Sequence, residues 1–149
     1  MNITKIDYRK TALILPFSGR WFSISINRGK IVQIIDNLIS NSEYWLIKLK
    51  GNDPNCKPSI TIKIESPWIY FYDNGYGISP AIENMLFEPF VTTKPKGEGR
   101  GLGLFIIQQL LDSSKCTIAL EPSRNEHGRK YIFAINFSNI INEYKWTKS

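Results

Sequence analysis

Residues 73–105 constrain the fold of this chain more than any other stretch, because two glycine-rich segments lie there on either side of a loop. The first segment reads DNGYGI from Asp73 and directly follows the apolar run WIYFY. The second has glycine at every other position from Gly97 to Gly103 and then continues into an amphipathic pattern. Glycine lets backbone amides approach a ligand closely, and free amides at the start of a helix attract anions. The stretch therefore predicts a phosphate-binding turn.

The order of the other elements predicts an α/β two-layer sandwich. Apolar patterns predict strands at 11–15, 21–26, 59–65, 68–73, 116–121 and 130–137, and helices at 29–49, 80–87 and 102–113. We expect a mixed, mostly antiparallel sheet with the helices on one face. The 149 residues suit one domain, which we divide into an N-terminal β-hairpin (1–28), a core (29–137) and a tail (138–149). The loop from Glu88 to Arg100 is expected to be a lid over the site.

The helix expected at 29–49 carries two asparagines one turn apart, Asn37 and Asn41, on a polar face beside its apolar stripe. The stripe consists of Ile31, Ile34, Leu38, Trp45 and Leu49, with Ile35 and Ser42 at its edge. Asparagine is a poor helix former, because its amide competes for backbone hydrogen bonds. The pair indicates either ligand contacts or the satisfaction of buried backbone groups, and the helix alone favours neither.

The bulk composition is that of a soluble globular chain, with 42% hydrophobic and 21% charged residues. No run is long and apolar enough to cross a membrane, and the N-terminus lacks a signal-peptide pattern, so we expect a cytoplasmic domain without membrane contact. Cys56 and Cys116 lack metal-ligand spacing and are expected to be reduced thiols. The formal charge of +6 permits nucleic-acid binding but does not argue for it, because the basic residues are scattered.

Four motifs in order resemble those of the GHKL (Bergerat-fold) ATP-binding domain, which histidine kinases, DNA gyrase B subunits, MutL proteins and heat-shock chaperones share. QIIDNLISNSEYWL resembles the N box, YDNGYGIS the G1 box, LFEPFVTTKP the F box and GEGRGLGLFI the G2 box. The resemblance covers about residues 30–137, and its wording is nearest to the histidine-kinase type. It implies ATP and Mg²⁺ as ligands.

The resemblance also implies a role for individual residues. Asn41 would coordinate Mg²⁺, Asn37 would support the triphosphate side, and Asp73 would accept a hydrogen bond from the adenine amino group. Gly75 and Gly77 would let the backbone pass beside the base, with Ile78 packed against it. The remaining implied residues belong to the phosphate end: Gly99, Gly101 and Gly103 as amide donors, Leu102 and Leu104 as anchors of that turn, and Lys94 and Arg100 as γ-phosphate contacts or solvated loop charges.

The sequence departs from the family pattern at two places. Many histidine kinases have a lysine where this chain has Tyr44, and Lys48 lies one turn further on the same face. The Gly-Thr that precedes the last strand in the family is Gly128-Arg129 here, which removes a hydroxyl from the adenine side.

Asn37 bears on the reaction, because hydrolases of the family carry a glutamate there that activates water, and an amide cannot act as a general base. The resemblance therefore implies a kinase-type Mg·ATP-binding domain that supplies the γ-phosphate to a histidine on another domain or partner. The only histidine of the chain, His127, is expected to be an exposed turn residue, and residues 1–28 are too few for a hairpin carrying an acceptor histidine. The alternative is an ATPase-like switch with slow or no hydrolysis that acts through a partner protein.

Overall fold

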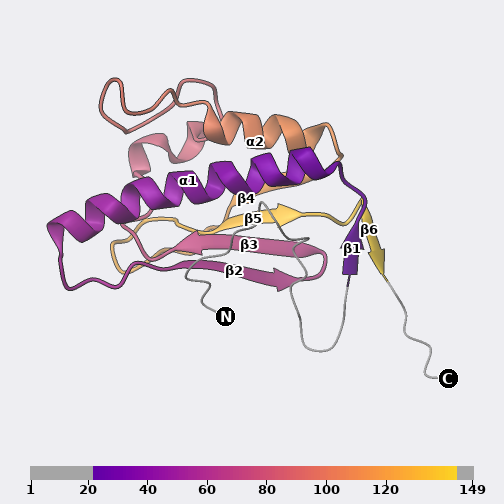
Figure 1. Cartoon of the computed structure of the whole chain (residues 1–149), viewed down its shortest axis with the longest axis horizontal. Helices are drawn as coiled ribbons and strands as arrows, with labels where there is room; N and C mark the ends of the chain where they lie inside the picture. Colours follow the sequence, from indigo (N-terminus) through magenta and orange to yellow (C-terminus); the bar gives the residue numbers. More distant parts are fainter. Residues whose placement is uncertain (1–21, 144–149) are drawn as a thin grey trace.

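The computed structural model describes residues 22–143, and side chains are described from Ile24 to Ile141. Its principal sheet has four strands: β2 (Ile60–Glu65), β3 (Trp68–Asp73), β4 (Thr117–Leu120) and β5 (Phe133–Asn136). The strands follow the order β2-β3-β5-β4, and all three pairings are antiparallel (Figure 1). The predicted α/β sandwich is confirmed, and β3 occupies the central place that its apolar sequence favours.

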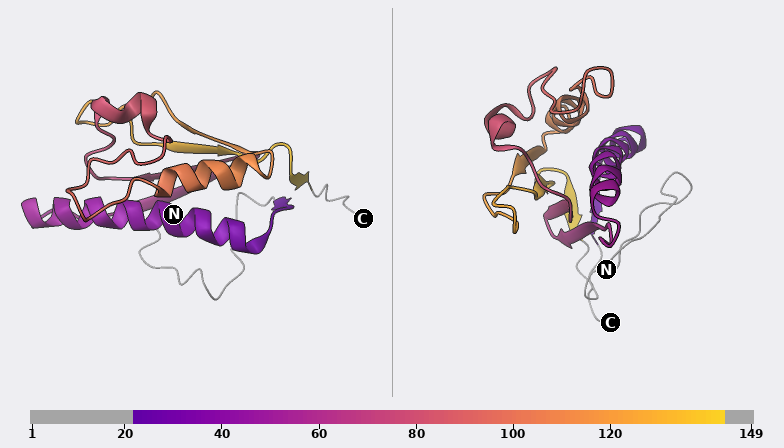
Figure 2. Two further views of the ribbon diagram at one scale, coloured as in Figure 1. Left: turned by 90° about the horizontal axis from the view of Figure 1, so that it is seen from above. Right: turned by 90° about the vertical axis from the view of Figure 1, so that its left-hand side faces the viewer.

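Two helices cover one face of this sheet, as predicted (Figure 2). Helix α1 (Arg28–Asn52) begins at Asn27, whose side-chain oxygen accepts hydrogen bonds from the backbone amides of Gly29 at 2.8 Å and Lys30 at 3.3 Å. It ends where the Asp53 amide donates to the Leu49 carbonyl. Helix α2 (Gly103–Asp112) starts at the last glycine of the second glycine-rich segment. In the part of the chain that the structure describes, no helix is long and apolar enough to cross a membrane.

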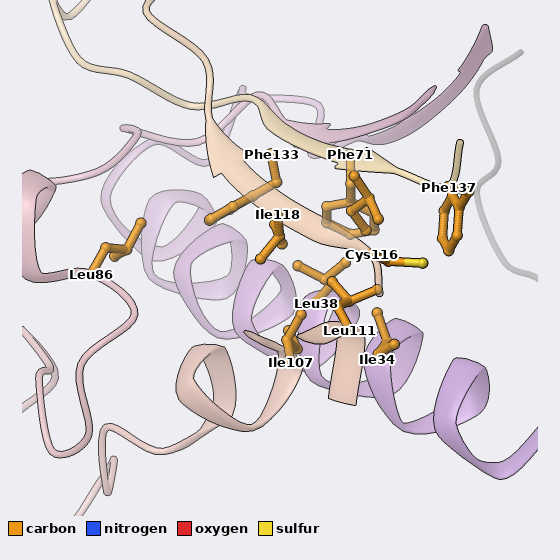
Figure 3. Close-up of a cluster of buried hydrophobic side chains, with 11 residues drawn as sticks. Ile34, Leu38, Phe71, Leu86, Ile107, Leu111, Cys116, Ile118, Phe133 and Phe137 are labelled. Carbon is orange, nitrogen blue, oxygen red and sulfur yellow. The ribbon is translucent and has the colours of Figure 1, made fainter. Parts of the chain in front are cut away.

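The core lies between the helices and the sheet (Figure 3). Strand alternation turns Ile69 and Phe71 of β3 toward the helices, where Phe71 pairs in register with Phe133 of β5. The largest fully buried side chains are Ile34, Leu38, Phe71, Ile107, Leu111, Ile135 and Phe137. The core thus fixes the end of β3, and with it Asp73, against the middle of α1.

The burial of α1 differs from the predicted stripe at its C-terminal half. Leu46 is buried, whereas Trp45 is only partly buried and lines a cavity described below. The predicted edge residues Ile35 and Ser42 are also buried. The reason is that α1 packs against both the sheet and α2, so its buried face is wider than a single stripe and turned toward Leu46.

Three smaller elements complete the described fold. The helix predicted at 80–87 is the 3₁₀ helix η1 (Pro80–Met85). Strand β1 (Phe22–Ile24) pairs antiparallel with β6 (Ile141–Glu143), which lies in the stretch we assigned to a tail. The strand predicted at 11–15, the hairpin it would form and the end of the tail lie outside the described residues.

Candidate functional site

Two adjoining cavities lie between α1, the end of β3 and the loop 87–102. The first, the sheet-end cavity, has a volume of about 140 Å³ and is lined by Asp73, Gly77, Ile78 and Tyr131, among others. The second, the lid cavity, has a volume of about 210 Å³ and lies against the second glycine-rich segment. Both cavities are lined by Asn41, Val91, Thr92, Lys94 and Leu104. They therefore form one continuous site that runs from the end of β3 to the start of α2.

The residues that the sequence singled out divide between these cavities. Asp73, Gly77 and Ile78 line the sheet-end cavity. The lid cavity is lined by Asn37, Gly99, Arg100, Gly101, Leu102 and Gly103, together with the shared Asn41, Lys94 and Leu104. Gly75 lines neither cavity; it is buried and donates its amide to the Asp73 carboxylate. The structure thus brings every predicted residue except Gly75 to the wall of one of the two cavities. Gly75 contributes only through its hydrogen bond to Asp73.

The Asp73 carboxylate is held at the end of β3 by two hydrogen bonds. The Ser42 hydroxyl on α1 donates to one oxygen at 2.5 Å, and the Gly75 amide donates to the other at 2.8 Å. Burial raises the pKa of Asp73, while the Ser42 and Gly75 donors oppose that rise. The result is an oriented acceptor in a largely desolvated place, which suits the recognition of a ligand that donates a hydrogen bond.

The turn 124–130 is joined to the first glycine-rich segment, beside the sheet-end cavity, through Asn125. Its side-chain amide donates to the Tyr76 carbonyl at 3.0 Å, and its oxygen accepts from the amides of His127 at 2.9 Å and Arg129 at 3.1 Å. This turn approaches the first glycine-rich segment so closely that a Cβ at Gly77, where φ is +84°, would meet Asn125 Nδ2 at 2.8 Å. Glycine at that position is therefore required by both backbone conformation and space.

The loop 87–102 is tied to the second glycine-rich segment at Gly101. The Phe90 amide donates to the Gly101 carbonyl at 2.8 Å. A Cβ at Gly101, where φ is +68°, would meet the backbone carbon of Phe90 at 2.5 Å and the backbone of Val91 at 2.7 Å. The two segments of loop thus pack backbone to backbone, and that packing brings Val91, Thr92 and Lys94 to the cavity wall.

The loop also contacts α1 through charged and aromatic side chains. The Tyr44 hydroxyl donates a hydrogen bond to Glu98, and Lys48 Nζ lies 3.4 Å from the same carboxylate. Lys94 Nζ lies 4.4 Å from the centroid of the Tyr44 ring. The Asn37 side-chain amide makes a long contact of 3.4 Å with the Gly103 carbonyl. Lys48 therefore pairs with the lid and lines neither cavity.

Several residues of the site were missed by sequence reasoning. Ser42 and Trp45 were assigned to the apolar side of α1, but Ser42 holds Asp73 and Trp45 lines the sheet-end cavity. Arg129 and Tyr131 line the same cavity, and Asn125 fixes the turn beside it. The signal that could have revealed Ser42 is a small hydroxyl residue beside Asn41 on a helix that faces a strand-end aspartate.

The donor set suits a polyphosphate with a divalent cation. Lys94 and Arg100 supply positive charge, the glycine-rich turn supplies backbone amides at the start of α2, and Asn41 supplies an amide oxygen. Among residues 22–143 there is no cluster of three or more His, Cys, Asp or Glu side chains that could hold a metal. A hard cation bound here would take most of its ligands from phosphate oxygens and water, as Mg²⁺ does in proteins.

Comparison with known families gives one match that spans most of the chain. The model described as "Histidine kinase-, DNA gyrase B-, and HSP90-like ATPase" matches residues 26–139. This range contains both cavities and all four motifs.

Comparison with curated proteins and solved structures points the same way. The alginate biosynthesis sensor protein KinB of Pseudomonas aeruginosa is 27% identical over 87% of this chain and 21% of its own length. The sensor protein GtcS of Aneurinibacillus migulanus is 32% identical over 67% of this chain and 26% of its own length. The chain thus spans about a quarter or less of these relatives. Among solved structures, the catalytic domain of histidine kinase ThkA is similar with a TM-score of 0.54 and 26% identity, covering 76% of this chain and 70% of that one. The mycobacterial sensor histidine kinase MprB shares the fold, with a TM-score of 0.57 and 19% identity over 78% of this chain and 74% of its own.

Proposed function

This chain belongs to the histidine kinase-, DNA gyrase B-, and HSP90-like ATPase family, and we propose that it is a histidine-kinase-type catalytic domain that binds Mg·ATP. It supplies the γ-phosphate to a histidine on another domain or a partner protein, and it works in the cytoplasm. The observation that carries the proposal is the continuous site, in which Asn41 and Lys94 line both cavities between Asp73 and the glycine-rich turn.

The sheet-end cavity takes the adenine base. Asp73 accepts a hydrogen bond from the exocyclic amino group, and its two fixed donors hold the carboxylate in the orientation that this contact needs. Ile78 packs against the base. A carboxylate that is already desolvated and oriented pays little further cost on binding, which supports selective recognition of an amino group over a carbonyl.

The lid cavity takes the phosphates. The amides from Gly99 to Gly103 face the phosphate oxygens, with Leu102 and Leu104 anchoring the turn, while Lys94 and Arg100 contribute charge. Asn41 would hold Mg²⁺ through its amide oxygen, and Asn37 supports the same wall. Held there by Asn41, Mg²⁺ would supply neutralisation of the phosphate charge.

The proposed reaction is transfer rather than hydrolysis. The bond from the γ-phosphorus to the bridging oxygen breaks, a bond to the acceptor nitrogen forms, and ADP leaves. Asn37 lines the lid cavity where a hydrolase would need a carboxylate, and an amide cannot take a proton from water. Asp36, its neighbour in sequence, lines neither cavity. The chain therefore orients the phosphate and leaves the nucleophile to its acceptor.

Calorimetric titration with ATP in the presence and absence of Mg²⁺ tests the proposal. The unaltered chain should bind Mg·ATP, and Asp73→Asn should weaken binding by about 100-fold, because a charge-assisted hydrogen bond is lost and an amide donor faces the amino group. The matched control is Asp36→Asn, which removes a carboxylate outside the cavities and should leave binding unchanged. Equal binding by the Asp73→Asn chain, or no binding by the unaltered chain, would contradict the proposal.

A second candidate is a nucleotide-dependent switch in which lid closure changes a protein contact. The contact of Glu98 with Tyr44 and Lys48 favours it, because the lid already has a docking place on α1. Incubation of γ-labelled ATP with the chain and a candidate acceptor separates the two. Acid-labile phosphate on the acceptor supports transfer, whereas nucleotide-dependent partner binding without labelling supports the switch.

A further inference from the structure

The side chain of Lys94 follows a defined path from the lid to α1. Its backbone amide donates to the Thr92 hydroxyl at 3.1 Å. Its stem then passes Gly99 so closely that a Cβ there would lie 2.7 Å from Lys94 Cδ. The ammonium ends 4.4 Å from the centroid of the Tyr44 ring on α1. Lys94 lines both cavities, so its side chain runs along the wall that they share on its way to Tyr44.

The Tyr44 ring is itself held by its neighbours. Its hydroxyl donates to Glu98, and this hydrogen bond is the main reason that the pKa of Tyr44 is raised, so the hydroxyl stays protonated. Its ring meets Trp45 edge to face, with centroids 4.9 Å apart and an interplanar angle of 88°. Lys48 Nζ lies 5.4 Å from the ring centroid. The ring is thus an ordered surface that presents its π-electrons to Lys94.

The charged groups around Tyr44 differ in whether they have an ion-pair partner. Glu98 is paired with Lys48 at 3.4 Å. Among residues 24–141, whose side chains the structure describes, Lys94 has no carboxylate within ion-pair distance, and burial lowers its pKa. The ring face therefore attracts the ammonium without neutralising it. A cation held in this way remains available to an anion that enters the cavities.

We propose that Tyr44 is a positioning residue whose ring holds the Lys94 ammonium beside the shared wall of the two cavities for a nucleoside polyphosphate. The proposal rests on the proposed function and adds a residue that lines neither cavity. It makes the phosphate end of the site depend on contact between lid and helix, because Lys94 comes from one and Tyr44 from the other.

The test compares three variants in titrations with Mg·ATP and with AMP. Tyr44→Leu removes the ring and should lower the ratio of ATP to AMP affinity about fivefold, the size expected for one partly exposed cation–π contact. Tyr44→Phe keeps the ring and should retain most of the ratio, even though it loses the bond to Glu98. Lys94→Ala should lower the ratio at least as far. Tyr70→Leu is the matched control, because it removes a ring that stacks on Trp68 and pairs across strands with Lys63. It should leave the ratio of ATP to AMP affinity unchanged.

The double variant separates a positioning role from a structural one. If Tyr44 acts through Lys94, then Tyr44→Leu should have no further effect in a chain that already carries Lys94→Ala. Gly99→Ala offers a second route, because its new Cβ would displace Lys94 Cδ. It should lower the ratio in the unaltered chain, and by less beside Lys94→Ala, where the new Cβ still meets the Cβ of residue 94 at 3.1 Å and Thr92 Oγ1 at 3.2 Å.

The outcomes distinguish this inference from the proposed function. Failure of the unaltered chain to bind ATP overturns both. ATP binding with a ratio that Tyr44→Leu leaves unchanged overturns the inference alone. Additive losses in the double variant overturn it as well, because they would mean that Tyr44 and Lys94 act independently.

Discussion

Asp73 and Lys94 line the same cavity, yet the chain holds them by different means. Asp73 stands at the end of a central strand, and its carboxylate accepts fixed hydrogen bonds from Ser42 and Gly75. Lys94 stands on a loop without helix or strand, and the lid reaches α1 through the Tyr44 ring and an exposed ion pair of Glu98. Buried hydrogen bonds cost far more to break than exposed ion pairs. We therefore expect the sheet end to be preformed and the lid end to respond to the ligand.

The largest effect is expected from a substitution that disrupts the packing of the lid against the glycine-rich turn. Gly101→Ala should destabilise the chain by about 2–3 kcal/mol, because the new Cβ would collide with the backbone of Phe90 and Val91 at a positive φ. Gly103→Ala is the matched control, since a Cβ there meets nothing within 4 Å and alanine favours helix. Urea unfolding of both variants measures the difference, and equal stabilities would mean that the lid does not pack on the glycine-rich turn.

The next effect is the pH dependence of stability that Asp73 causes at the sheet end. Burial raises the pKa of Asp73 above its ordinary value of 3.8, so the folded chain binds more protons than the unfolded chain in that range. The stability that this group contributes is present below pH 3.8 and is lost as the pH rises through its raised pKa. Asp73→Asn should therefore gain stability relative to the unaltered chain as the pH rises above 3.8 and through the raised pKa of Asp73.

Ser42→Ala tests the cause of that pH dependence. The Ser42 hydroxyl lowers the pKa of Asp73, so its removal should raise that pKa further and widen the pH range over which stability falls. Urea unfolding at several pH values measures both variants. Parallel stability curves for the unaltered chain and Asp73→Asn would show that the Asp73 carboxylate is well hydrated.

The smallest expected effect concerns the outer contact of the lid. Glu98→Gln removes the ion pair with Lys48 but keeps an acceptor for Tyr44, so ATP affinity should change by less than about twofold. Hydrogen exchange is the sharper measurement. The amide hydrogen of residue 98, which is bonded to the Pro95 carbonyl, should exchange faster, while the Ile78 amide hydrogen, which is bonded to the Lys130 carbonyl, stays protected. Faster exchange at Ile78 would mean that the two ends are not independent.

Much of the fold followed from local patterns. Strands β2 to β5 and helices α1 and α2 lie where apolar periodicity placed them, because each buries one face against the same core. The pairing of β1 with β6 was not predictable, since three-residue strands carry almost no pattern and their partners are far apart in sequence. The wider buried face of α1 also depends on α2, which the periodicity of α1 cannot reveal.

For the site, the motif residues and their supports fall into two groups. Asn37, Asn41, Asp73 and the glycines from Gly97 onward were recognisable because their residue types are costly or unusual where they stand in the local structure. Ser42, Tyr44, Trp45 and Asn125 were not, because serine, aromatic residues and asparagine are ordinary in a helix edge or a turn. Their roles depend on partners far away in the sequence. The partner lies 31 residues away for Ser42, 54 residues away for Tyr44 and 49 residues away for Asn125.

The sequence by itself therefore determined the family and the sandwich fold, and it marked the candidate site, since glycine-rich turns and paired asparagines are local signals. Only the tertiary structure decided how the two ends of the site are held. Ser42 and Gly75 fix the Asp73 carboxylate, and Tyr44 faces Lys94, because packing of α1 against β3 and the lid brings these side chains together. The physical reason is that hydrogen-bond and cation–π energies depend on distances of a few ångströms, which no one-dimensional pattern specifies.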